Sequence, residues 1–283
     1  MEKILVTGAN GQLGSEIQVL ASQYSDFEFV FTDIVDFPLD DESVIIANFE
    51  KIQPNIVINC AAYTAVDKAE EDSVTANVVN HLAVATLAKL CHDNQSKLIH
   101  ISTDYVFDGN SPIAYTEEDV PNPQSVYGVT KLAGEQACAS LCPDSIIIRT
   151  AWVYSEFGNN FVKTMLRLMR ERKAIGVVID QIGAPTYAAD LAQAIFTILN
   201  SGKWESGLYH YSNAGEISWY EFAKDIKEIA QLSCEVNGIP TSSYPTPAQR
   251  PSFSLMDTSK IKEKYAVQIV PYKESLKKMM AKL

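Results

Sequence analysis

The segment TGANGQLG, residues 7–14, decides the fold. It follows an apolar run at Lys3–Thr7 and precedes an amphipathic stretch, so its three glycines join a predicted strand to a predicted helix. Residues without a Cβ let the backbone approach a pyrophosphate, and the helix N-terminus adds free N–H groups and partial positive charge. A plain glycine turn is the alternative, but the strand before and the helix after favour a dinucleotide site. We expect that site to involve Gly8, Asn10, Gly11, Gln12, Leu13 and Gly14.

Apolar runs alternate with helical patterns over the first half of the chain. The runs are nearly continuous, as expected for parallel strands covered on both faces, and lie at Lys3–Thr7, Phe27–Thr32, Ile56–Asn59, Leu98–Ser102 and Ile146–Arg149. The clearest helical pattern, Ser73–His92, has an apolar stripe formed by Val78, Val79, Leu82, Ala83, Thr86, Leu87 and Leu90. The alternation predicts an α/β fold with a Rossmann-type, doubly wound parallel sheet.

The pattern changes after Trp152. Loops rich in Gly and Pro separate three predicted helices, at Asn159–Glu171, Ala188–Asn200 and Trp219–Ala230. Ser218 and Glu221 have the spacing of a capping box at the start of the third helix, and the proline-rich Tyr244–Pro251 predicts an extended loop. We therefore expect a dinucleotide-binding domain at residues 1–152 and a smaller, mainly substrate-binding lobe at 153–283, with some later elements returning to the first domain.

The composition argues against several classes of protein. Apolar residues make up 47% of the 283, enough for a packed core rather than a disordered chain. The formal net charge of −12 and the lack of a basic stripe argue against nucleic-acid binding. Because a strand is predicted at Lys3–Thr7, we expect no signal peptide, and we expect no membrane span, since no apolar stretch has the length of one. The five cysteines lack metal-binding spacing and fit reduced thiols in a cytoplasmic protein.

Two strand ends provide further candidates for the dinucleotide site. Asp33 lies about twenty residues past the glycines, where a carboxylate can accept hydrogen bonds from an adenosine ribose. It would repel a 2′-phosphate, which favours NADH over NADPH, although Asp33 could instead cap a turn. Asp40 is a candidate adenine contact on the same argument. After the third strand, Ala61, Ala62 and Tyr63 would let a nicotinamide ribose lie close to the backbone, unless the small residues serve only packing.

Three side chains suggest carbonyl/alcohol chemistry. Thr103 follows the fourth strand, and Tyr127 and Lys131 follow about two dozen residues later at helical spacing i, i+4, which puts them on one helix face. An ammonium beside a phenol lowers the phenol pKa, so the tyrosine can exchange the proton that the conversion requires. The Thr103 hydroxyl could hydrogen-bond the substrate oxygen. A Tyr-x-x-x-Lys pair alone is common by chance, but the glycine turn and the hydroxyl at a strand end make the catalytic interpretation the better one.

These features together resemble the extended short-chain dehydrogenase/reductase superfamily, and within it the dTDP-4-dehydrorhamnose reductase family. The similarity extends over nearly the whole chain. It rests on the ordered stretches GANGQLG, NCAAYTAVDKAE, ISTDYVFDG, YGVTKLAGE, RTAWVY, GNNFVKTMLRL, DQIGAPTYAADLA and YPTPAQRP.

The resemblance implies reduction of the 4-keto group of dTDP-4-dehydrorhamnose, with Tyr127 as proton donor, Lys131 on the nicotinamide ribose and Thr103 orienting the ketone. The family's contacts to the deoxysugar fall on Thr64, Val66, Tyr105 and Trp152, and those to the nucleotide part on Asn159, Asn160, Phe161, Gln181 and Arg250. Trp152 could instead be a core aromatic. Arg250 would clamp a diphosphate with its guanidinium fork, or lie on the surface as most arginines do.

The cofactor and the assembly are less determined. The family uses NADPH and in some members NADH, whereas Asp33 favours NADH, so both stay candidates. The resemblance also allows a homodimer, and some members dimerise through Mg²⁺ bound by acidic residues. Glu16 and Asp190 lie at matching places, but two carboxylates do not define a metal site, and we interpret them as surface residues.

Two other functions stay open at this point. A sugar-nucleotide epimerase or 4,6-dehydratase could use the same scaffold, although a dehydratase needs a glutamate where Tyr105 follows Asp104. An epimerase would keep its cofactor bound between turnovers. A non-catalytic regulatory subunit of a methionine adenosyltransferase is the second alternative, against which the intact set of Thr103, Tyr127 and Lys131 argues.

Overall fold

Six parallel strands form one central sheet in the computed structural model, which describes residues 1–283. The strands run in the order β2-β1-β3-β4-β5-β10 from one edge to the other. Their bounds are β1 Glu2–Thr7, β2 Phe27–Phe31, β3 Ile56–Asn59, β4 Lys97–Thr103, β5 Ile146–Thr150 and β10 Gly207–His210. The chain moves outward from β1 to β2 and then returns to β3 on the other side of β1. This reversal opens a crevice at the carboxyl ends of β1 and β3, where ligands of doubly wound sheets bind.

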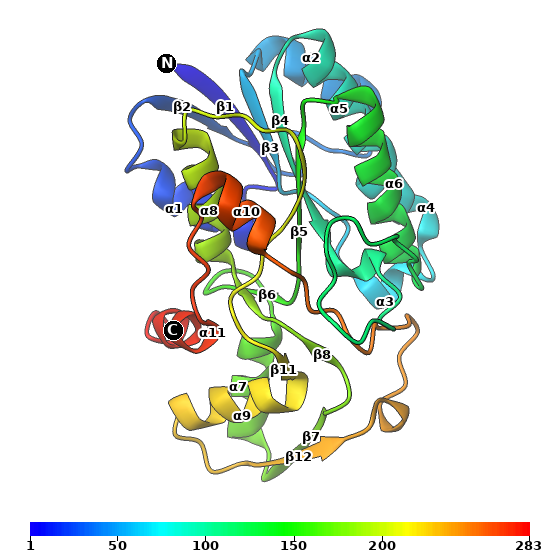
Figure 1. The fold of residues 1–283 in the computed structure, drawn as a ribbon, viewed down its shortest axis with the longest axis vertical. Coiled ribbons are helices and arrows are strands. Elements are labelled where there is room, and N and C mark those ends of the chain that lie inside the picture. The colour runs from blue at the N-terminus through cyan, green and yellow to red at the C-terminus, as the bar shows by residue number, and fades with distance from the viewer.

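Helices cover both faces of the sheet, which is why its central strands are apolar on both sides (Figure 1). One face packs against α1 (Gln12–Ala21), α8 (Ala188–Asn200) and α10 (Ser259–Tyr265). The other face packs against α2 (Glu42–Ile52), α5 (Ala83–Asp93) and α6 (Val126–Leu141). The doubly wound fold is therefore confirmed. All five strands predicted from the sequence are present, and β10 is a sixth that the sequence analysis missed.

The helix expected at Ser73–His92 contains one turn of π-helix. It consists of α4 (Ser73–Asn77), the π-turn at Val78–Leu82 and α5. The buried stripe of this helix is formed by Ala83, Val84, Leu87, Ala88 and Cys91, and Leu82 lies outside it and is exposed. The stripe predicted through Leu82 is thus wrong in part. By length and composition Ser73–Asp93 could also cross a membrane, contrary to the expectation that no stretch could, but its α5 part packs on the sheet.

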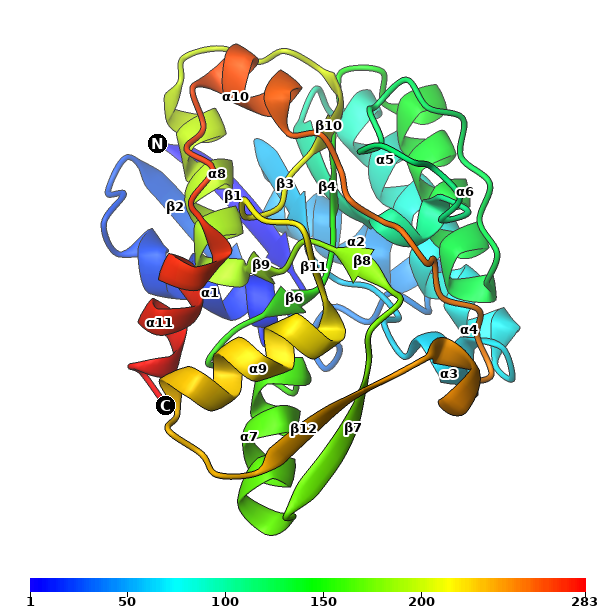
Figure 2. The same cartoon turned by 60° about the horizontal axis from the view of Figure 1, so that its bottom comes forward.

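A smaller lobe follows β5 and lies beyond the carboxyl ends of the strands (Figures 1 and 2). Its core is formed mainly by α7 (Phe161–Glu171), α9 (Trp219–Ile229) and α11 (Tyr272–Met280). Three pairs of short strands complete it: β6 (Val153–Tyr154) with β9 (Thr186–Tyr187), β8 (Ile182–Gly183) with β11 (Ile217–Ser218), and β7 (Ala174–Val178) with β12 (Glu235–Ile239). The capping box of Ser218 and Glu221 is present at α9, as predicted.

Segments after Trp152 contribute to both parts of the molecule. The helix α8 packs against α1, and β10 pairs with β5 in parallel register. After β12 the chain passes through a 3₁₀ turn at Thr241–Ser243 and the loop Tyr244–Pro251, which runs beside α3 (Val66–Ala69) in both views (Figures 1 and 2). The segment is a loop without helix or strand, as its prolines predicted, and it bends at Tyr244, Pro247 and Ala248. A domain boundary at Trp152 therefore stays a prediction, because α8 and β10, which follow Trp152 in the chain, pack with the central sheet.

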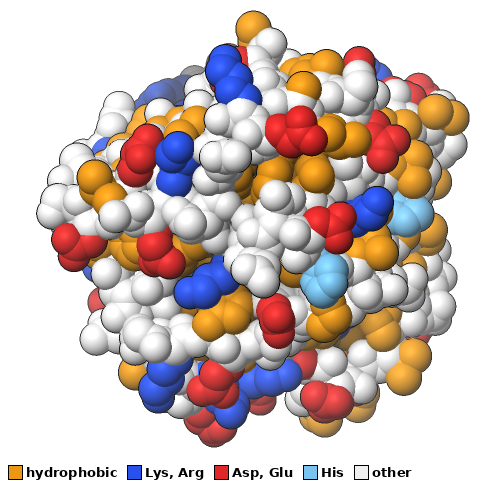
Figure 3. Space-filling view, turned by 90° about the horizontal axis from the view of Figure 1, so that it is seen from above, with side chains coloured by type: hydrophobic (Ala, Val, Ile, Leu, Met, Phe, Trp, Pro, Cys, Tyr) orange, Lys and Arg blue, Asp and Glu red, His pale blue; other side chains and the backbone are white.

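Acidic and basic side chains are interspersed on the face seen from above in Figure 3, with apolar groups between them. Lysines and arginines do not gather into a stripe on this face. Over the whole chain carboxylates outnumber lysines and arginines, which gives the net charge of −12.

Candidate active site

One large cavity of about 840 Å³ lies at the carboxyl ends of the strands, between the sheet and the second lobe. It begins beside Asp33 and Asp40, passes the glycine turn, and reaches Thr103, Tyr127 and Lys131. These residues are distant in sequence, and they meet because parallel strands all end at the same edge of a sheet. The cavity therefore connects the predicted nucleotide site to the predicted catalytic residues.

The glycine turn has the geometry of a phosphate cradle. Gly8 has a φ of +66°, and a Cβ at this position would lie 2.7 Å from the Cα atom of Ala61 after β3. A Cβ on Gly14 would lie 2.3 Å from the carbonyl oxygen of Gly8, so this glycine permits α1 to begin close to the strand. The N-cap Gly11 offers no side-chain cap, and the first turn of α1 has no acidic residue. Its free N–H groups and partial positive charge suit an anionic group.

Asp33 closes the turn from the side of β2. Its Oδ2 accepts a hydrogen bond from the Asn10 backbone N–H at 2.6 Å, and its Oδ1 accepts one from the Ile34 N–H at 2.7 Å. The carboxylate thus has the turn-capping role considered above, and it also lines the cavity. Asp40 lines the same end, whereas Asn10 and Gly14 support the turn without lining it. Among the lining residues the only Lys or Arg is Lys131 at the far end.

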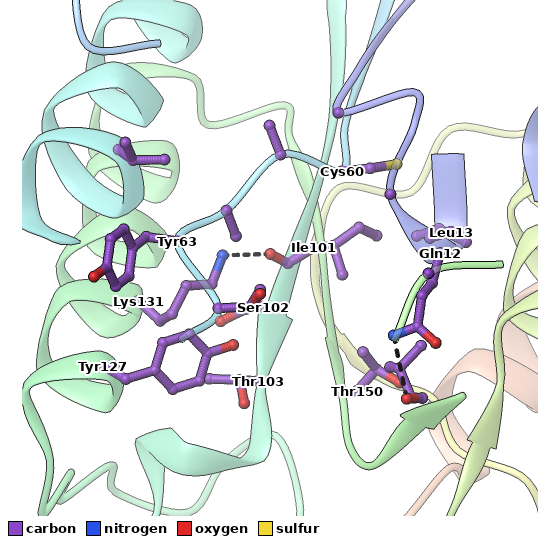
Figure 4. A pocket seen from close by; sticks show the side chains of 18 of the residues that line it. Gln12, Leu13, Cys60, Tyr63, Ile101, Ser102, Thr103, Tyr127, Lys131 and Thr150 are labelled. Carbon is purple, nitrogen blue, oxygen red and sulfur yellow. Dashed lines mark hydrogen bonds between the residues drawn. The ribbon is translucent and has the colours of Figure 1, made fainter. Parts of the chain in front are cut away.

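The helix α6 positions Tyr127 and Lys131. Ser125 caps it by accepting a hydrogen bond from the Gly128 N–H at 3.2 Å, so the tyrosine lies in the first turn and the lysine one turn later. Both side chains lie with Thr103 at the end of the cavity away from Asp33, which we call the cavity floor. The Lys131 ammonium donates a hydrogen bond to the Ile101 carbonyl at 2.7 Å (Figure 4). Burial lowers the pKa of Lys131 to about 8, which the Glu135 carboxylate partly offsets.

The structure does not show the expected lowering of the Tyr127 pKa by Lys131. Burial raises the pKa of Tyr127 to about 12, although the neighbouring Thr103 hydroxyl lowers it in part. The lysine donates to the Ile101 carbonyl rather than to the neutral phenol, so no hydrogen bond from the ammonium offsets the effect of burial. A raised pKa keeps the phenol protonated at neutral pH, which suits a residue that donates a proton.

Beside Thr103, the end of β4 supplies two polar groups that were not singled out from the sequence, Ser102 and Asp104. Thr103 Oγ1 donates to Asp104 Oδ1 at 3.0 Å and accepts from the Tyr105 N–H at 3.2 Å. Burial raises the pKa of Asp104 to about 6, and its carboxyl lines the cavity. Ser102 Oγ and Tyr63 Oη are buried there without a hydrogen-bond partner. Such groups are costly unless a ligand or water satisfies them, so they indicate a binding site.

The four predicted contacts to the deoxysugar all line the cavity, namely Thr64, Val66, Tyr105 and Trp152. Trp152 has a φ of +49° and stacks on Trp219, with ring centroids 3.5 Å apart and an angle of 11° between the planes. It is half-buried rather than a core residue, so one side of the ring packs and another faces the cavity. Trp219, from α9 of the second lobe, had no signal in the sequence beyond its helical position.

Three other predicted contacts have different surroundings. Asn160 caps α7 and also donates to Gln12 Oε1 at 3.0 Å, while its neighbour Asn159 lines the cavity. Gln181 is buried and donates to Thr241 at 3.2 Å. Arg250 forms an ion pair with Asp67 instead of extending freely to solvent. These three side chains join different parts of the chain, and a substrate role for any of them stays a prediction.

Glu16 and Asp190, the two carboxylates considered as magnesium ligands, form hydrogen bonds with other residues of the chain. Glu16 Oε1 accepts from the Ser155 hydroxyl at 2.6 Å, and Asp190 Oδ2 accepts from Asn213 at 2.7 Å and from the Ser275 hydroxyl. Glu16 is 1% exposed, so the surface interpretation of this residue was wrong. No group of three or more His, Cys, Asp or Glu side chains in residues 1–283 has the arrangement of a metal site.

Known proteins resemble this chain along its full length. The family model described as the RmlD substrate binding domain matches residues 1–283. A dTDP-4-dehydrorhamnose reductase from Aggregatibacter actinomycetemcomitans is 40% identical and covers 99% of each chain.

Among solved structures, a dTDP-4-dehydrorhamnose reductase from Clostridium acetobutylicum superposes with a TM-score of 0.95 at 39% identity, covering 99% of this chain and 98% of that one. One from Bacillus anthracis, in complex with NADP, superposes with a TM-score of 0.94 at 37% identity, covering 100% and 99%. The cavity, its glycine turn and the Thr103–Tyr127–Lys131 floor occur in a chain that matches these proteins from end to end, and the chain belongs to the RmlD substrate binding domain family.

Proposed function

We propose that this protein is an NAD(P)H-dependent oxidoreductase that reduces the 4-keto group of dTDP-4-dehydrorhamnose to give dTDP-L-rhamnose. The observation that supports it most directly is the single cavity that holds a dinucleotide cradle at one end and a phenol, an ammonium and a hydroxyl at the other. The family of reductases to which the chain belongs supplies the identity of the sugar nucleotide. This support favours the reductase over the epimerase and the regulatory subunit considered from the sequence.

The residues present fit a nicotinamide dinucleotide. The turn at Gly8 and the uncapped N-terminus of α1 would bind the pyrophosphate, and Asp33 and Asp40 lie where the adenosine would extend. Ala61 and Ala62 leave space along the cavity towards Lys131. When bound, the dinucleotide supplies the hydride for the reduction.

The chain's own residues then manage the proton. Tyr127, protonated at neutral pH because burial raises its pKa to about 12, would donate its phenolic proton to the oxygen at C4 of the sugar. Thr103 would hold that oxygen, since its hydroxyl lies on the same cavity floor. Once the phenol has lost its proton, the nearby Lys131 ammonium stabilises the tyrosinate until solvent reprotonates it.

The test mixes purified protein with dTDP-4-dehydro-6-deoxy-L-mannose and follows the absorbance of NADPH and NADH in separate reactions. We expect stoichiometric oxidation of at least one cofactor and a product that co-migrates with dTDP-L-rhamnose. Conversion of the sugar without net oxidation of added cofactor would favour an epimerase. No conversion with either cofactor would refute the proposal. We further propose a cytoplasmic location and a homodimer, the latter to be checked by light scattering.

A further inference from the structure

Three polar side chains form a row across the otherwise apolar centre of the sheet. Thr7 of β1 lies opposite Asn59 of β3, and Asn59 lies opposite His100 of β4. All three point to the face covered by α5 and α6 and are at most 1% exposed. The preceding residues of that face, Leu5, Val57 and Leu98, belong to the apolar core. A buried polar row of this kind is costly unless every member has a partner.

The row is connected by hydrogen bonds and ends at Lys131. Thr7 Oγ1 lies 2.7 Å from Asn59 Oδ1, and Asn59 Nδ2 lies 3.1 Å from His100 Nδ1. The other ring nitrogen, His100 Nε2, lies 3.4 Å from Lys131 Nζ. The lysine that faces the cavity is thus supported from behind by a chain that begins one residue before the glycine turn.

The charge of Lys131 decides which nitrogen of His100 carries the proton. An ammonium only donates, so Nε2 must offer its lone pair and the proton must lie on Nδ1. Asn59 must then present its oxygen to Nδ1–H and its amide N–H₂ to Thr7, which is the exchanged orientation of the amide, because oxygen and nitrogen of an amide are assigned from the network. With the opposite orientation, Nε2–H would point at Lys131 and fit only a neutral amine.

We propose that His100 is a positioning residue for the reduction. Asn59 and Thr7 fix it as the neutral Nδ1–H tautomer. In this form it accepts a hydrogen bond from Lys131, which keeps the lysine ammonium charged and directed at the cavity floor. This inference rests on the proposed function for its kinetic consequence and on the hydrogen-bonded row for its structure. The other ionisable groups around Lys131 are Glu135 and Cys138 on α6, Cys60 after β3 and Tyr127 in the cavity. Glu135 is itself paired with Arg149 of β5 at 2.7 Å.

The kinetic test compares His100→Leu, His100→Gln and wild type over a range of pH. Leucine removes the acceptor, so the alkaline limb of kcat shifts to lower pH by about one unit, since one hydrogen bond to the charged form is lost. Glutamine can accept from Lys131 and donate to Asn59, so it should restore the wild-type limb. His210→Leu is the matched control, because His210 is also a buried sheet histidine but its ring packs on Phe107. An unshifted limb in His100→Leu would overturn the proposal.

A second measurement does not depend on activity. Long-range proton–nitrogen NMR of protein labelled at its four histidines reports the tautomer of each ring, and comparison with His100→Gln assigns the signal. We expect the Nδ1–H tautomer for His100 throughout neutral pH. An Nε2–H tautomer or a protonated ring would contradict the proposal, even if the Leu variant failed to fold. Failure of the proposed function would appear differently, as a wild-type protein that does not reduce the sugar.

Discussion

The guanidinium of Arg250 forms a two-pronged ion pair with the carboxylate of Asp67, with Nη1–Oδ1 at 2.8 Å and Nη2–Oδ2 at 2.6 Å. The pair joins the loop after β12 to α3, and Asp67 also accepts from the Ala248 N–H at 3.2 Å. Its side chains are 23% and 41% exposed, so the pair itself adds about 1 kcal/mol or less to the free energy of unfolding. Its importance lies in where it places the arginine, near Tyr105 at the edge of the cavity.

We expect Arg250→Met to raise the KM for the dTDP-sugar about 10- to 100-fold, because a guanidinium that reaches the diphosphate provides charge-assisted hydrogen bonds. The kcat should change much less, since Arg250 does not contact the cavity floor. Steady-state kinetics with saturating cofactor measures both constants. Arg167→Met, which removes an exposed helical ion pair with Glu171, is the control and should leave the KM unchanged. An unchanged KM in Arg250→Met would restrict this residue to its pairing with Asp67.

Substitution of Tyr127 by Phe should lower kcat about 10²- to 10⁴-fold, the usual contribution of a positioned general acid. Binding of the cofactor should persist, because phenylalanine retains the ring that packs against Tyr105. Single-turnover assays measure the first effect, and fluorescence titration with NADPH and NADH measures the second. Tyr154→Phe serves as the control, since the Tyr154 hydroxyl is buried in the second lobe without a partner. A Tyr127→Phe enzyme with wild-type turnover would remove the phenol from the mechanism.

The dinucleotide preference should depend on Asp33. A 2′-phosphate would meet this carboxylate at an end of the cavity that no lysine or arginine lines, so we expect kcat/KM to be higher with NADH than with NADPH. Asp33→Asn removes the like charge, and the ratio of kcat/KM for NADPH over NADH should rise about tenfold. The NADP complex of the relative from Bacillus anthracis makes this comparison informative. If the wild type strongly preferred NADPH, the 2′-phosphate would have to bind away from Asp33.

Asp104 should reduce the stability of the folded protein above about pH 6. Burial raises the pKa of this carboxyl from 3.8 to about 6, so the folded state binds the proton more tightly than the unfolded chain. The free energy of unfolding contributed by Asp104 therefore falls as the pH rises from about 4 to about 6, by up to about 3 kcal/mol. Asn at this position retains an acceptor for Thr103 and carries no charge.

We thus expect Asp104→Asn to raise the free energy of unfolding by about 1–2 kcal/mol at about pH 8 and to leave it unchanged at about pH 4. Urea denaturation at both values measures the difference. The control is Asp93→Asn at an exposed position, where both pH values should give changes within about 0.5 kcal/mol. Equal effects of Asp104→Asn at both pH values would show that its charge is not the cause.

The sequence by itself determined the features that are local in the chain. The glycine turn at Gly8 requires residues without a Cβ, the apolar runs specify buried strands, and the spacing of Tyr127 and Lys131 specifies one helix face. Each of these depends on backbone geometry or on a period of two or about 3.6 residues, so a short window contains the information. The site residues that line the cavity were found for the same reason, since they follow strands whose carboxyl ends meet at one edge.

Only the tertiary structure decided which distant residues meet. The partner of Arg250 lies 183 residues earlier in the chain, β10 joins the sheet beside β5, and the row of Thr7, Asn59 and His100 exists only because β1, β3 and β4 are neighbours in that order and register. The sequence contains all three polar residues, yet no local period relates them. Their contacts depend on strand order and on the packing of α6, which follow from burying the whole apolar surface of the chain at once rather than from any one segment.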